Sequence, residues 1–140
     1  MGEIIVVGVD GSETALEAAR TAARLAAGMG ASLRVVTAYD GDTGGVVAIG
    51  SDRWMFSDAA QAEIMTADIA RLLGTTTSEI SCAAVPGKPQ DVLIGEAERL
   101  NAKLIVVGNR RMQGLGRVLG SVANTVAHNA PCDVYIVKTT

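Results

Sequence analysis

Glycines and arginines gather in one segment of the chain, between a run of apolar residues and the start of a helical pattern. The apolar run is Leu104 to Val107, and the helical pattern begins near Ser121. Glycine lets a backbone approach a ligand closely, and the first N–H groups of a helix are unpaired and partly positive. The segment therefore predicts a phosphate site, and the glycines and arginines considered for it are Gly108, Arg110, Arg111, Gly114, Gly116 and Gly120.

A second polar turn, Asp10-Gly11-Ser12, follows the first apolar run of the chain. The carboxylate of Asp10 could accept a hydrogen bond from a ribose hydroxyl or face a metal ion. Alternatively, Asp10 or Ser12 serves only to cap the helix that follows.

The patterns of common catalytic sites are missing from the sequence. A dinucleotide fingerprint through Gly114 and Gly116 would need a third glycine where Leu119 stands, and Gly87-Lys88-Pro89 lacks the Ser or Thr of a P-loop. The single histidine, His128, falls late in a helix where it would face solvent, and no nucleophile is paired with it. The sequence therefore predicts no enzyme and no metal centre, and a slow ATPase is the least favoured alternative.

The elements that must position these residues alternate regularly along the chain. Apolar runs predict strands at 3–9, 32–39, 78–85, 103–108 and 133–139, and helical spacing predicts helices at 13–28, 57–74, 89–101 and 117–129. This alternation indicates a single α/β domain over residues 1–140, with an open five-stranded parallel sheet, helices on both faces and a Rossmann-like strand order of 3-2-1-4-5. Ligands bind such sheets where the strand order reverses, so the turn at Asp10 and the loop after Gly108 should meet in one crevice.

The core must be aliphatic because only 3% of the residues are aromatic. In the helix at 57–74 the apolar positions at helical spacing are Ala62, Met65, Ile69 and Leu72, which we expect to be buried. The two cysteines, Cys82 and Cys132, form no metal-ligand pattern and are expected to be buried thiols. For residues 41–56 the sequence leaves two alternatives, a short strand or a segment that covers the edge of the sheet. Their aromatic cluster could be a local hydrophobic plug or a lid.

Twelve basic and fifteen acidic residues give a net charge of −3, which argues against nucleic acid as the main partner. No apolar run approaches the length of about 20 residues that a membrane span needs. The first residues lack the basic start of a signal peptide, so we expect a cytoplasmic protein without membrane contact.

Three stretches resemble the universal stress protein family: VVGVDGSETALEAA, VPGKPQDVLIGEAERLNAKLIVVGN and GLGRVLGSVANTVAHNAPCDVYIVK. The resemblance covers the full chain and implies a dimer paired through the last strand. In the ATP-binding branch it implies an adenine nucleotide site marked by Gly, two residues, Gly, nine residues, then Gly-Ser or Gly-Thr. Gly108 and Gly120-Ser121 match this motif, whereas Arg111 stands where the middle glycine belongs and only eight residues separate it from Gly120.

Carried over residue by residue, the resemblance implies that Asp10, Ala38 and Val107 surround the adenine and ribose. The residues that would face the phosphates are Gly108, Gly120, Ser121 and Val122. Arg111 could add a charge-assisted bond to phosphate, could fill the phosphate space and close the site, or could be a solvated loop charge.

The resemblance and the loop together favour a stress-response module that binds ATP, with or without Mg²⁺, or cyclic AMP instead, and acts as a sensor. The alternative is a homodimer that works through protein contacts without a nucleotide. Self-association is also expected from the residues, because Val134, Ile136 and Val137 lie on a strand that no later strand covers.

Overall fold

Five strands and four helices alternate along the residues that the computed structural model describes, 2–39, 59–74, 79–109 and 121–139. The strands are β1 (Ile4–Gly8), β2 (Ser32–Tyr39), β3 (Ile80–Pro86), β4 (Leu104–Gly108) and β5 (Asp133–Val137). The helices are α1 (Glu13–Met29), α2 (Ala59–Leu73), α3 (Pro89–Leu100) and α4 (Ser121–Asn129). The expectations for 41–56, for Arg110 and Arg111 and for the glycines between 114 and 120 fall outside the described residues.

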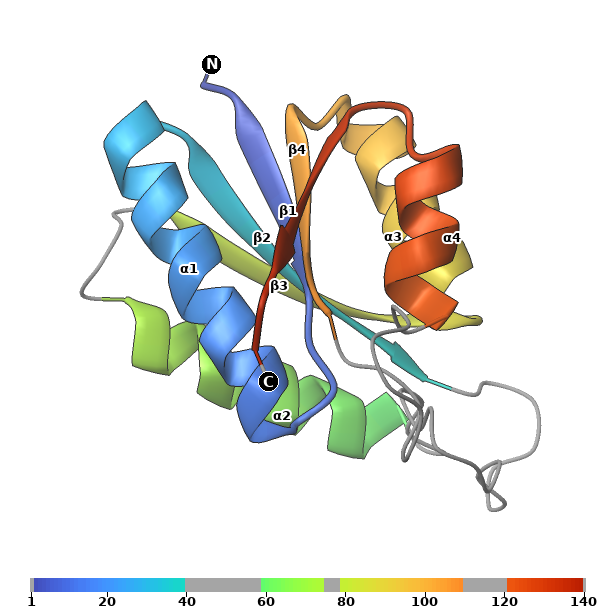
Figure 1. The fold of residues 1–140 in the computed structure, drawn as a ribbon. Helices are drawn as coiled ribbons and strands as arrows, with labels where there is room; N and C mark the ends of the chain where they lie inside the picture. The colour runs from blue at the N-terminus through green and yellow to red at the C-terminus, as the bar shows by residue number, and fades with distance from the viewer. Residues whose placement is uncertain (1, 40–58, 75–78, 110–120, 140) are drawn as a thin grey trace.

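The strands form one parallel sheet in the order β3-β2-β1-β4-β5, which confirms the predicted fold class and topology. Helices α1 and α2 cover one face of the sheet, and α3 and α4 cover the other (Figure 1). The central strands β1 and β4 are buried on both faces, as their runs of Val, Ile and Leu predict. Strands β3 and β5 are the two edges, as expected for both.

Each face of the sheet has its own aliphatic core. On the face covered by α1 and α2, six alanines of α1 are buried against β1, β2 and β4: Ala15, Ala18, Ala19, Ala22, Ala23 and Ala26. On the face covered by α3 and α4, Val6, Val36, Ile105 and Val107 pack against helix residues such as Leu93 and Val126. Because alanine has a small side chain, α1 can lie close to the sheet.

Helix ends follow from local sequence. Ser12 caps α1, and Gly30 ends it with a left-handed backbone of φ 68°, a conformation that glycine adopts without strain. Pro89 stands at the first turn of α3, where its missing N–H costs nothing, and Asn101 ends that helix with φ 54°. None of the helices that the structure describes is long and apolar enough to cross a membrane.

The predicted buried face of the helix at 57–74 is wrong in part. Ala62 and Ile69 of α2 are buried and Met65 is half-buried, but Leu72 is 61% exposed and its neighbour Leu73 is buried instead. The buried stripe of α2 runs through Thr66, whose hydroxyl has a partner inside the sheet. The helix is therefore turned so that Leu73, rather than Leu72, faces β2 and β3.

The cysteines also differ from expectation. Cys82 is exposed because β3 is an edge strand, and Cys132 is half-buried just before β5. Burial raises the pKa of the Cys132 thiol above its ordinary value of 9.0, and the neighbouring carboxylate of Asp133 raises it further.

Candidate functional site

The carboxyl ends of β1 and β4 lie side by side where the strand order reverses. Pairing of β1 with β4 ends at Val7 and Val106, whereas pairing with β2 continues through Gly8 to a hydrogen bond from Val9 N to Val36 O, 2.9 Å. Beyond Val7, β1 therefore follows β2 and is no longer paired with β4. This is the place where open parallel sheets accept ligands.

The turn after β1 holds the carboxylate of Asp10 in a defined position. Both Ser12 N and Ser12 Oγ donate to Asp10 Oδ1, at 2.9 and 2.6 Å. Ser12 Oγ in turn accepts from Ala15 N at 3.1 Å, so Ser12 is the helix cap and Asp10 is the residue that Ser12 orients. Gly11 takes φ 88°, a left-handed conformation that glycine adopts without strain and that lets the chain make this turn.

The end of β4 continues into Asn109, whose N–H donates to Val137 O at 2.9 Å. Gly108 is half-buried and has no positive φ. A methyl group placed on Gly108 would meet Thr139 Cγ2 at 3.6 Å and Ala18 Cβ at 3.9 Å, which are ordinary contact distances. Packing against the described residues therefore does not itself require glycine at 108.

Three further residues carried over from the family resemblance lie in one cluster. Ala38 at the end of β2, Val107 in β4 and Val122 in α4 are all buried in the core on the α3 and α4 face. Ser121, the first residue of α4, is exposed. Because Val107 and Val122 share a cluster, the N-terminus of α4 is tied to the same face of the sheet as the end of β4.

The carried-over position Gly120 and the departing residue Arg111 lie outside the described residues. His128 is exposed in the last turn of α4, as predicted. Across the described ranges, no three side chains of the His, Cys, Asp and Glu types gather in a group that could hold a metal ion.

Sequence reasoning missed two contacts at this edge of the sheet. The turn after β3 is bound to the end of β2 by a hydrogen bond from Gly87 N to Tyr39 O, 2.9 Å, which fixes the start of α3 beside the same edge. The side chain of Asn109 binds Thr139, beyond the end of β5. An asparagine directly after a buried strand was the available signal for the second contact, but its partner is 30 residues away in the sequence.

Comparison with known proteins agrees with the fold. The model of the Universal stress protein family matches residues 1–138. A universal stress protein of Mycobacterium tuberculosis is 32% identical over 154 aligned positions, which cover 97% of this chain and 96% of that protein. One of Methanocaldococcus jannaschii is 33% identical over 139 positions, covering 96% and 81%.

Two similar solved structures contain a nucleotide. A universal stress protein in complex with cAMP has a TM-score of 0.73 and 31% identity, covering 99% of this chain and 98% of that one. The universal stress protein from Archaeoglobus fulgidus in complex with dAMP has a TM-score of 0.73 and 25% identity, covering 97% and 98%. A family match along nearly the whole sequence, joined to the same parallel sheet, leads to one conclusion: the chain belongs to the universal stress protein family.

Proposed function

We propose that this protein binds an adenine nucleotide at the carboxyl edge of β1 and β4 and acts as a cytoplasmic stress-response sensor or regulatory module. The observation that carries the proposal is that the carboxyl ends of β1 and β4 lie side by side where the strand order reverses. There the carboxylate of Asp10, oriented by two hydrogen bonds from Ser12, follows the end of β1, the strand that lies beside β4. The cAMP and dAMP complexes of two similar universal stress proteins support the choice of an adenine nucleotide.

The residue types suit the parts of such a ligand. The carboxylate of Asp10 can accept hydrogen bonds from ribose hydroxyls. Ser121 begins α4, and the positive end of a helix dipole favours phosphate. The proposed site comprises Asp10, Ala38, Val107, Gly108, Arg111, Gly120, Ser121 and Val122, with ATP as ligand, with or without Mg²⁺, or cyclic AMP instead. Arg111 would supply a charge-assisted bond to phosphate.

The test begins with acid release and chromatography of any nucleotide that purifies with the protein. Titration calorimetry with ATP–Mg²⁺ and with cyclic AMP follows. We expect one nucleotide per chain and a loss of affinity of tenfold or more in Asp10→Ala. Asp91→Ala, an exposed aspartate in the first turn of α3, is the matched control. A protein that is empty and ignores both ligands would refute the proposal.

A second function rests on β5. We propose that the chain forms a homodimer along this edge strand, whose residue Tyr135 is 44% exposed. Val134 and Ile136 are half-buried against the core on the α3 and α4 face, so pairing of the free edge would cover them further. If no nucleotide binds, self-association of this kind is the favoured mode of action. Analytical ultracentrifugation should find a dimer at micromolar concentration and a weaker one in Tyr135→Arg; a monomer would contradict this.

A further inference from the structure

The side chain of Asn109 is held in one orientation at the end of β4. Its Oδ1 accepts from Thr139 N at 2.9 Å and from Thr139 Oγ1 at 3.0 Å. A backbone N–H can only donate, so the amide atom that faces Thr139 must be the oxygen and not the nitrogen. The backbone N–H of Asn109 also donates to Val137 O, so both parts of this residue are fixed by the chain at and beyond the end of β5.

This orientation decides where the amide nitrogen lies. The oxygen and the nitrogen of an amide are bonded to one planar carbon, so with Oδ1 turned to Thr139 the NH₂ group is turned away from it. Within the described ranges, Nδ2 of Asn109 has no hydrogen-bond partner, although the residue is half-buried. No buried side-chain nitrogen or oxygen of the described residues lacks a hydrogen-bond partner, so Nδ2 is open to solvent, where an acceptor from water or from a ligand can reach it.

Asn109 stands at the edge where the nucleotide is proposed to bind. It follows Gly108 directly and lies three residues beyond Val106, just as Asp10 lies three residues beyond the paired residue Val7. The start of α4 is tied to this side of β4 through the cluster that holds Val107 and Val122. The amide donors and the positive end of α4 are thus at the same end of β4, which suits an anionic group.

We propose that Asn109 Nδ2 donates a hydrogen bond to a phosphate oxygen of the bound nucleotide, and that Thr139 is the positioning residue that turns the amide toward it. The inference rests on the proposed function, since it names a further contact of the same site. It assigns a ligand role to the residue after Gly108 and a supporting role to the segment after β5. The substrate class it requires is a phosphorylated adenine compound rather than a nucleoside.

Asn109→Asp separates the acceptor role of the Asn109 side chain from its donor role. The carboxylate keeps an acceptor for both Thr139 donors, but it replaces the NH₂ group with a negatively charged oxygen that repels phosphate. Asn109→Ala removes the donor and the acceptor together. Thr139→Val removes only the hydroxyl donor, since the backbone N–H remains. Asn129→Asp introduces the same change of charge at the far end of α4 and is the control.

The experiment is calorimetric titration of the full chain with ATP–Mg²⁺, with cyclic AMP and with adenosine, which has no phosphate. We expect Asn109→Asp to bind the two nucleotides ten- to a hundredfold more weakly, the range for loss of a hydrogen bond to a charged group. Adenosine affinity should change less than threefold, and Asn129→Asp should bind all ligands as the unaltered protein does. Thr139→Val should bind the two nucleotides about threefold more weakly and leave adenosine affinity unchanged. A merely structural role would not affect the nucleotides alone.

Each outcome separates the inference from the function on which it rests. If the unaltered protein binds none of the ligands, the proposed function and this inference both fall. If it binds nucleotides and Asn109→Asp binds them equally well, only the inference is overturned. An equal loss for adenosine and nucleotides would also overturn it, because the residue would then support the fold. If Asn109→Asp melts at a lower temperature than the unaltered protein, Asn109→Ser replaces it, with the same ligand comparison.

Discussion

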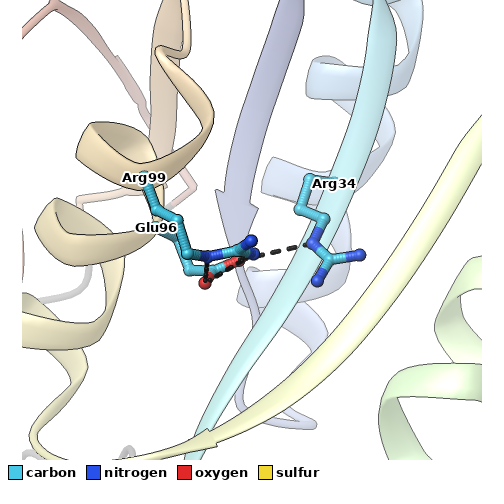
Figure 2. Close-up of polar contacts among 3 residues, drawn as sticks. All are labelled: Arg34, Glu96 and Arg99. Carbon is cyan, nitrogen blue, oxygen red and sulfur yellow. Dashed lines mark hydrogen bonds and ion pairs between the residues drawn. The ribbon is translucent and has the colours of Figure 1, made fainter.

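The carboxylate of Glu96 lies 3.3 Å from the Nε atom of Arg34, and this contact joins α3 to β2 across 62 residues of sequence. Arg99, one turn further along α3, donates to both oxygens of the same carboxylate at 3.0 Å. Figure 2 shows the three side chains pointing toward one another between the helix and the sheet. The Glu96 side chain is only 8% exposed, so two guanidinium groups compensate a carboxylate that water barely reaches.

Replacing Glu96 with alanine should lower the free energy of unfolding by about 2–3 kcal/mol. The substitution leaves the guanidinium of Arg34 in a half-buried position without its partner, and its residual contact with water keeps the loss below that of a fully buried pair. Urea unfolding followed by circular dichroism measures the loss. Glu98→Ala, on the exposed side of the same helix, should change stability by less than about 0.5 kcal/mol. Equal effects of the two substitutions would show that the pair contributes nothing.

The hydroxyls of Thr37 and Thr66 should behave as a coupled pair. They are 2.6 Å apart in a fully buried position between β2 and α2, and Thr66 Oγ1 also contacts Ala62 O at 2.5 Å. Thr66→Val should cost about 1–3 kcal/mol because it leaves the Thr37 hydroxyl buried without a partner. The double substitution with Thr37→Val should cost less than the sum of the two single ones. Additive losses in a double-mutant cycle would contradict the coupling.

Ser12→Ala should destabilise the protein by about 1 kcal/mol through loss of the cap on α1. It also removes the Oγ donor that orients Asp10, so nucleotide affinity should fall together with stability. Thermal unfolding and calorimetry on the same sample measure both quantities. Ser32→Ala serves as the control, because its hydroxyl makes an exposed contact with Glu3 O at the amino ends of β1 and β2, the opposite end of these strands from Asp10. A change in stability with unchanged nucleotide affinity would show that the Ser12 cap stabilises the fold but does not contribute to the nucleotide site.

Cys132 should react with iodoacetamide more slowly than Cys82 at pH 8. Burial first, and then the charge of Asp133, raise the pKa of the Cys132 thiol, so less of it is the reactive thiolate, whereas Cys82 is exposed. The folded protein therefore binds this proton more tightly than the unfolded chain does. Its contribution to stability is complete below the ordinary thiol pKa of 9.0 and is lost as the pH rises through the raised value. Mass spectrometry of the modified peptides measures the two rates, and equal rates would contradict the prediction.

The sheet was predictable because its strands are marked locally. β1 and β4 are short runs of Val, Ile and Leu between turn residues, and α1 and α3 begin with a serine cap and a proline. The buried face of α2 was only partly predictable. Thr66 holds a core position because it meets Thr37, 29 residues earlier, and no periodicity of apolar residues reveals such a partner.

The candidate site was also predictable only in part. Asp10 and Ser121 could be located from sequence, since each stands where a strand or helix boundary is marked by turn residues. The sequence could not assign the cap between Asp10 and Ser12, because both residue types accept from backbone N–H groups. The contact of Asn109 with Thr139 depends on β5 lying beside β4, so it becomes visible only once the strand order is known.

The alanine face of α1 has a consequence for rigidity. Alanine has no side-chain rotamers, so burying six of these residues against the sheet costs no side-chain conformational entropy. The same residues cannot change rotamer when a ligand arrives or leaves. The sheet below the Asp10 turn is therefore backed by a layer with little internal freedom on that side, and motion linked to binding must be sought in other parts of the molecule.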